Sequence, residues 1–153
     1  DGVVSGSMAL HLLLLASHTY STLWLPTDLD IYVPFWSENL IARLLVGQGY
    51  HLHELASVDV AVYAGTSIHS VCAFSKGCYK IDVIVSVNAA CIVPVFQFHT
   101  TAVMNFVSTD HIFCAYPALK MQACSHVNPT LLYNGGLHCK AIAPLQKYMS
   151  CGF

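Results

Sequence analysis

Charged side chains are scarce in this chain. Only 9% of its 153 residues are Asp, Glu, Lys or Arg, against about 25% in an ordinary soluble domain. The six Lys and Arg are scattered, so there is no basic stripe to follow a phosphate backbone, and long nucleic acid is not an expected partner. Because 56% of the residues are hydrophobic, we expect a protein partner to cover part of the apolar surface.

The chain also lacks a long uninterrupted apolar run. A helix that crosses a bilayer needs about 20 apolar residues, whereas Met8–Ala16 is too short and contains His11. The longer stretch from 81 to 98 contains Asp82, which is costly in lipid. No basic segment precedes Met8, so a signal peptide is not expected. We therefore predict a soluble, intracellular protein in the cytoplasm, without a membrane partner.

Paired cysteine spacing is absent as well. The seven Cys include no C-x-x-C pair, and an odd, unpaired set argues against a disulfide framework. The nine His are densest at His51–Glu54, but no Cys/His set has the ligand spacing of known zinc modules. We interpret the cysteines as small buried side chains in a reducing compartment.

The local patterns predict alternating strands and helices, which indicate an α/β or α+β fold with one mixed sheet and helices packed on one face. Ser7 is a suitable N-cap for the first helix, and Gly47 with Gly49 should end the second. The expected elements are a strand near 3–5, a helix over Met8–Tyr20, a strand over Asp28–Val33, a helix from Ser37 to Leu45, a short strand over Val58–Tyr63, a hairpin of 67–74 with 78–85, a helix starting in 95–107 and a terminal helix over 143–149.

The length suits a single domain. We divide it into a core of residues 1–95 and a helical C-terminal extension, 96–153, that packs on the core. The chain starts at Asp1 rather than Met and stops at Phe153 without a tail. We therefore interpret it as a fragment of a longer protein.

Two carboxylates share one face of a predicted strand. Alternation places Asp28 and Asp30 on the same side, roughly 7 Å apart along the strand, with Leu29 and Ile31 on the other side. Like charges so placed repel one another unless a cation or a proton intervenes. Mg²⁺ commonly binds such a pair together with substrate phosphates. A polar pair at an exposed strand end is the alternative interpretation.

A third acid, Asp82, lies within the apolar run of the predicted hairpin. An unpaired acid is costly to bury there, so Asp82 needs a metal ion, water or an opposite charge. Lys80, two residues back on the same face, is the alternative partner. Asp59 is the rival acid, but Asp82 lies in the longer and more apolar strand.

Gly6 and Ser7 precede the first predicted helix. A glycine at a helix N-terminus allows a phosphate to approach the backbone N–H groups, and the helix dipole favours the anion. The Ser7 hydroxyl adds a donor. Taken alone this is a weak signal, because Ser-Gly-Ser is more often ordinary turn chemistry.

In combination, these motifs resemble the nucleotidyltransferase superfamily, which includes DNA polymerase beta, the poly(A) polymerases and the antibiotic nucleotidyltransferases. The signature is Gly-Ser, then Asp-apolar-Asp-apolar, then apolar-Asp-apolar, found here at Gly6-Ser7, 28–31 and 81–83. The resemblance covers residues 3–86. The 20 residues that separate Ser7 from Asp28 form a longer connection than in compact members of the family. Segments 24–30 and 98–105 also resemble uncharacterised nucleotidyltransferase-like proteins of mushroom-forming fungi.

The resemblance implies a nucleotidyltransferase-like fold and a metal-dependent reaction. Asp28 and Asp30 would hold two Mg²⁺ or Mn²⁺ ions, with Asp82 contacting one ion and helping to deprotonate the acceptor hydroxyl. Gly6 and Ser7 would hold the phosphates of a nucleoside triphosphate such as ATP. The acceptor is left open. Two alternatives remain: a degenerate nucleotidyltransferase fold acting as a binding or regulatory module, and a structural domain whose acids coincide by chance.

Overall fold

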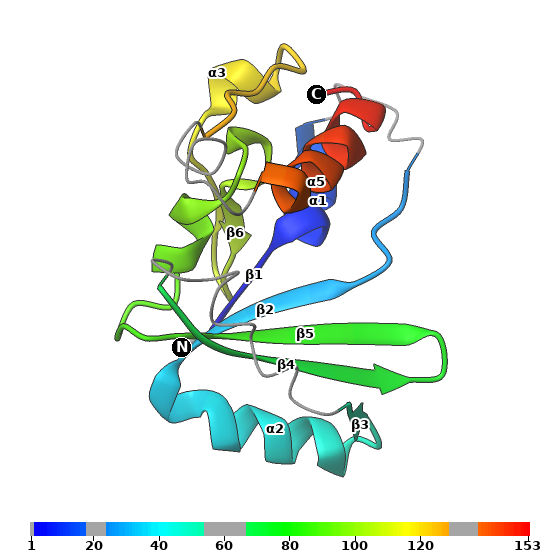
Figure 1. Cartoon of the computed structure of the whole chain (residues 1–153). Coiled ribbons are helices and arrows are strands. Elements are labelled where there is room, and N and C mark those ends of the chain that lie inside the picture. The colour runs from blue at the N-terminus through cyan, green and yellow to red at the C-terminus, as the bar shows by residue number, and fades with distance from the viewer. Residues whose placement is uncertain (1, 18–23, 54–66, 129–137) are drawn as a thin grey trace.

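A single mixed β-sheet organises the chain (Figure 1). The computed structural model describes residues 2–17, 24–53, 67–128 and 138–153. Within them, seven strands lie in the order β3-β4-β5-β2-β1-β6-β7. The predicted α+β class with a mixed sheet is confirmed. The strands are β1 (Val3–Ser5), β2 (Leu29–Pro34), β3 (His51–Leu52), β4 (Ile68–Lys76), β5 (Tyr79–Ser86), β6 (Asn105–Val107) and β7 (Ile112–Cys114).

The predicted hairpin forms from β4 and β5, which pair antiparallel from Ile68↔Ser86 to Lys76↔Tyr79. The turn is shorter than the expected loop at 75–77, since only Gly77 and Cys78 lie outside the strands. Gly77 has φ of 60°, which the first central position of a II′ hairpin turn requires. The tight turn therefore extends both strands.

Strand β2 lies parallel to β5, so the two predicted acid-bearing strands are neighbours in the sheet, as expected. Their register pairs Asp30 with Asp82 and Val33 with Val85. Side chains at paired positions point to the same face. One face of both strands is therefore apolar, and the other carries the acids at one end.

Helix α2 (Glu38–Gly47) covers the apolar face. Its Ile41 and Leu45 pack on a buried cluster of β2, β4 and β5, formed by Val33, Cys72, Phe74, Ile81, Val83 and Val85. The predicted glycine stop is present: Gly49 has φ of 83°, and the Tyr50 N–H donates to the Leu45 carbonyl at 3.0 Å. This left-handed C-terminal motif satisfies carbonyls that the helix leaves free.

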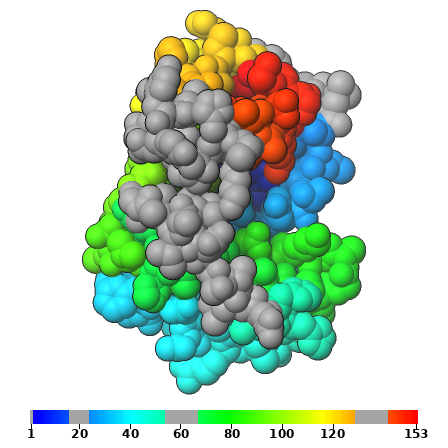
Figure 2. Space-filling view, in the orientation of Figure 1, coloured from blue at the N-terminus to red at the C-terminus, as the bar shows by residue number. Residues whose placement is uncertain are grey.

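Helix α1 (Gly6–Ser17) and helix α5 (His138–Ser150) lie on the other side of the sheet from α2 (Figure 1). The space-filling view likewise shows α2 and α5 at opposite ends, with the hairpin between them (Figure 2). Leu10 and Leu14 of α1 form a buried cluster with Val103 and Tyr148. The expectation that α1 and α2 share one face is therefore wrong, because β1 ends directly in α1 on the acid-bearing side.

The C-terminal third contributes strands as well as helices. The helix predicted to start in 95–107 does not form. That segment instead contains two short 3-10 turns, 93–97 and 101–103, followed by β6. Pro94 is the second residue of the first turn, and Thr100 caps the second turn by accepting from the Ala102 N–H at 3.3 Å.

Strand β6 pairs with β1 and β7 and so enlarges the sheet. A boundary at residue 95 therefore cuts through one sheet, and 96–153 is not a purely helical extension. The short helix α3 (Pro117–Lys120) follows β7. The predicted strand at 58–63, with Asp59, lies outside the described residues. No helix among the described residues has the length and apolar character needed to cross a bilayer.

Candidate metal and nucleotide site

Three carboxylates meet where β2 and β5 run side by side. Asp28, Asp30 and Asp82 each offer one oxygen, and these oxygens lie within 4.8 Å of one another. The parallel register creates the meeting, because Asp30 lies opposite Asp82. Among the described residues, this is the group of three or more His, Cys, Asp or Glu that is placed to share a metal ion. The residues chosen from the sequence are therefore together in space.

Burial and repulsion by neighbouring carboxylates disfavour the charged forms of Asp30 and Asp82. The pKa of Asp30 rises to about 7, first because the group is buried and then because Asp28 and Asp82 are negative. Burial, followed by the charge of Asp28, also raises the pKa of Asp82. Without a divalent cation, protons therefore neutralise part of the cluster.

The start of α1 lies directly against the acids. Gly6 has φ of +67°, and a Cβ atom added there would be 1.9 Å from the Asp30 Oδ2. Only glycine satisfies both the backbone conformation and this close approach. Strand β1 is antiparallel to β2 with Ser5 opposite Asp30, which brings the next residue, Gly6, to this position.

Ser7 lies within the first turn of α1 rather than at its N-cap, because the helix already begins at Gly6. Its hydroxyl donates to the Asp28 Oδ1 at 3.3 Å. The predicted phosphate-binding pair is thus adjacent to the three acids, and Ser7 is in contact with one of them.

Helix α5 brings two residues to the site that the sequence analysis did not select. The positive charge of Lys147 lowers the pKa of Asp30 and opposes the larger effects of burial and the other acids. Tyr148 is buried against α1, and burial and then the charges of Asp30 and Asp28 raise its pKa. Its ring stacks on His99 with centroids 5.8 Å apart.

No motif marked Lys147, because its position depends on how a terminal helix docks. The available signal was indirect: a helix was predicted over 143–149, and a terminal helix places apolar residues against the core. Tyr148 is that contact, and the neighbouring Lys147 is carried to the acids with it.

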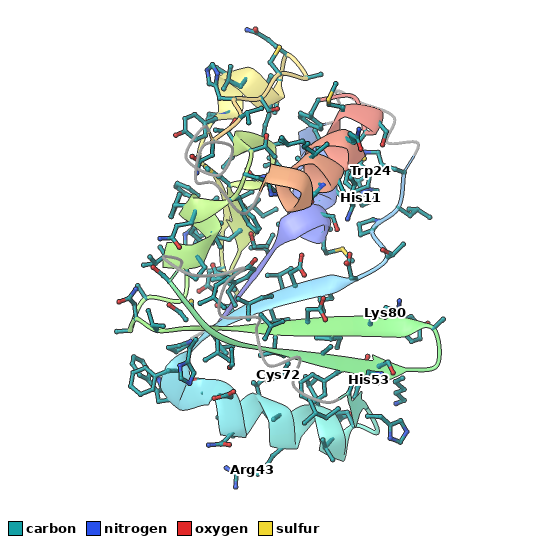
Figure 3. The ribbon with its side chains drawn as sticks, in the orientation of Figure 1. His11, Trp24, Arg43, His53, Cys72 and Lys80 are labelled. Carbon is teal, nitrogen blue, oxygen red and sulfur yellow. The ribbon has the colours of Figure 1, made fainter. Side chains whose placement is uncertain are left out.

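Lys80, Arg43 and Lys76 differ in how they relate to the three acids. Lys80 on β5 lowers the pKa of Asp82, but burial and Asp28 act in the opposite direction. Arg43 lies on the outer side of α2, away from the acid-bearing face (Figure 3). The Lys76 ammonium donates to the Gln48 carbonyl at 2.8 Å. Lys80 is therefore a partial counter-charge, and neither Arg43 nor Lys76 serves the site.

Comparisons with known proteins found no match to a protein-family model, to a curated protein or to a solved structure.

We predict that stability falls as the pH rises through the titration of Asp30. The folded pKa is about 7 and the ordinary value is 3.8, so between these values the folded chain keeps a proton that the unfolded chain loses. The contribution of Asp30 to stability should be fully present below about pH 4 and should be lost toward pH 8, by on the order of a few kcal/mol. The lowered pKa of His99, about 4, acts in the opposite direction between pH 4 and 6.5, so the contribution of Asp30 is measured as the difference between the wild-type chain and Asp30→Asn in urea unfolding with a chelator present.

Exposed Asp110 provides the matched control. Asp110→Asn should leave the pH dependence of the unfolding free energy unchanged. An Asp30→Asn variant with the wild-type slope would contradict the assigned electrostatics.

We also predict that Gly6→Ala strongly destabilises the chain. The substitution combines the left-handed backbone penalty of about 1–2 kcal/mol with overpacking of about 1–3 kcal/mol against Asp30. Gly152→Ala is the control, because Gly152 has φ of +97° and no atom within 4 Å of the added Cβ. Denaturant unfolding should show a much larger loss for Gly6→Ala. Equal losses would contradict the close approach of Asp30.

Proposed function

We propose that this chain is a metal-dependent nucleotidyltransferase domain that transfers a nucleoside monophosphate from a nucleoside triphosphate to a hydroxyl acceptor. The observation that carries the proposal is the convergence of the three carboxylate oxygens within 4.8 Å. Asp30 and Asp82 come from strands 52 residues apart in the sequence and meet beside Asp28 with raised pKa values, which favours a site over a chance arrangement.

The donor set fits Mg²⁺ or Mn²⁺, because hard divalent cations prefer oxygen ligands and bind few carboxylates when phosphates supply the rest. Asp28, Asp30 and Asp82 would hold the metal. When bound, the cation would neutralise phosphate charge and polarise the reacting phosphoryl group. Binding of the cation would release the carboxyl protons to solvent and would offset the repulsion that raises the pKa of Asp30.

The chain's own residues would divide the remaining work. Asp82 would accept the proton of the acceptor hydroxyl, whose oxygen attacks the α-phosphorus while pyrophosphate leaves. Gly6 and Ser7 at the start of α1 would hold the outer phosphates, since backbone N–H groups and the helix dipole favour an anion there. Lys147 would add a positive charge on the α5 side.

A degenerate binding or regulatory module is the second candidate, and one observation favours it. Lys147 already supplies a positive charge that acts on Asp30, and Ser7 already donates to Asp28. Polar groups that already pair with one another do not require a bound substrate to neutralise their charges or complete their hydrogen bonds. Metal binding is expected under both candidates, whereas transfer is expected only for the enzyme.

We predict that Mn²⁺ and Mg²⁺ raise the thermal stability of the chain at pH 8. Asp30→Asn should abolish this increase and leave the metal-free fold intact, because it removes a repelling charge without changing shape. Asp82→Asn should weaken metal binding less but stop the transfer of label from nucleoside triphosphates. Calorimetric titration and pyrophosphate release measure the two effects, with Asp110→Asn as the control.

Each result of this experiment separates the candidates. Metal binding with transfer supports the enzyme, and metal binding without transfer supports the degenerate module. Thermal stability that is indifferent to both cations, or an Asp30→Asn variant that unfolds without metal, would contradict the metal site.

The role of Lys147 gives a separate prediction. If it contacts the triphosphate, Lys147→Met should weaken binding of a metal–nucleotide complex about 10-fold, as expected for loss of a charged hydrogen bond, while Mn²⁺ alone binds equally or more tightly. Lys76→Met is the matched control. Weaker Mn²⁺ binding with unchanged nucleotide affinity would contradict this role.

A further inference from the structure

Lys120 is a fully buried lysine outside the proposed site. It ends α3, and its side chain is 0% exposed. Its ammonium group donates to the Thr101 carbonyl at 2.9 Å and makes a side-chain hydrogen bond with Cys114. No carboxylate of the described residues acts on it. A carbonyl and a thiol are unusual partners for a buried charge, which ordinarily requires an opposite one.

Burial favours the neutral form of Lys120. It lowers the pKa of the Lys120 amine, and the contact with Cys114 opposes only part of that shift. A neutral amine is a nucleophile. Burial therefore places a nucleophilic nitrogen beside the Cys114 sulfur.

Exposure determines which atom an oxidant meets. Cys114, at the end of β7, is a free cysteine that is partly exposed, whereas Lys120 is enclosed. Hydrogen peroxide can therefore reach the Cys114 sulfur. The nucleophile in contact with that sulfur is the Lys120 nitrogen. Exposed Cys124 is the nearest cysteine in the sequence, and its thiol is directed to the Gln122 carbonyl at 3.4 Å.

We propose that Cys114 and Lys120 form an oxidative modification site, in which hydrogen peroxide converts the contact into a covalent sulfur–nitrogen cross-link between β7 and α3. In the first step, the Cys114 sulfur attacks peroxide and the O–O bond breaks. The sulfur is oxidised by two electrons to sulfenic acid, and peroxide is reduced to water. In the second step, Lys120 Nζ attacks that sulfur and the S–O bond breaks. Water leaves with one proton from the nitrogen, and the S–N bond forms. The chain has then lost two hydrogen atoms, and a thiol reductant restores both side chains.

Trypsin reports on the cross-link directly, because it does not cleave after a lysine whose Nζ is substituted. In the reduced chain, cleavage after Lys80, Lys120 and Lys140 releases peptides 81–120 and 121–140. After treatment with peroxide and blocking of free thiols, we expect loss of cleavage at Lys120. A single 81–140 peptide should appear, and its fragment masses should place the missing hydrogens at Cys114 and Lys120. Dithiothreitol should restore the cleavage.

Three variants complete the design. Cys114→Ser and Lys120→Arg should each abolish the cross-link, and Lys120→Arg keeps a buried cation without the amine nucleophile. Cys124→Ser should leave the cross-link unchanged, which separates it from a Cys114–Cys124 disulfide. If a variant fails to fold by circular dichroism, the peptide map of the wild-type chain decides alone. Cleavage at Lys120 that persists while Cys114 is recovered as sulfenic acid, sulfinic acid or a disulfide would overturn the proposal.

Discussion

The parallel pairing of β2 with β5 is the constraint on which the rest of the structure depends. It joins two segments 52 residues apart in the sequence and fixes Asp30 opposite Asp82. The same register aligns Val33 with Val85 on the opposite face, where α2 packs. A slip by one residue would move the acids into the apolar cluster and the valines toward α1. Hydrophobic burial on one face therefore maintains electrostatic repulsion on the other.

Much of this arrangement could be predicted from local patterns. The alternation around Asp28–Val33 assigned two acids to one face, and the apolar run around Asp82 identified the partner strand. The end of α2 near Gly49 could also be predicted, because glycine readily adopts the left-handed conformation that ends many helices. The position of β6 beside β1 was not predictable in this way, because three-residue strands carry too little periodicity. For the same reason, the contribution of α5 to the site depended on tertiary docking.

Gly6 shows how the site and the fold are coupled. Its positive φ turns the chain from β1 into α1, and its missing side chain leaves room for the Asp30 carboxylate. The sequence marked Gly6 as a phosphate-binding glycine, whereas the structure gives it a second role as the residue that admits an acid. Local rules are commonly broken where function requires it, and here a buried acid and a left-handed turn occur at one point.

Three kinds of positive charge compete for the same carboxylates. A proton binds Asp30 with a pKa of about 7, so near neutral pH the carboxyl group of Asp30 is about half ionised. Lys147 favours the ionised state through its own charge, and a divalent cation would favour it far more strongly, because it contacts several oxygens at once. Protonation and metal binding are thus linked, and acidification weakens any metal site built from these acids. The position of α5 sets the balance between them, since Lys147 stabilises the carboxylates that a metal would need while repelling the metal itself.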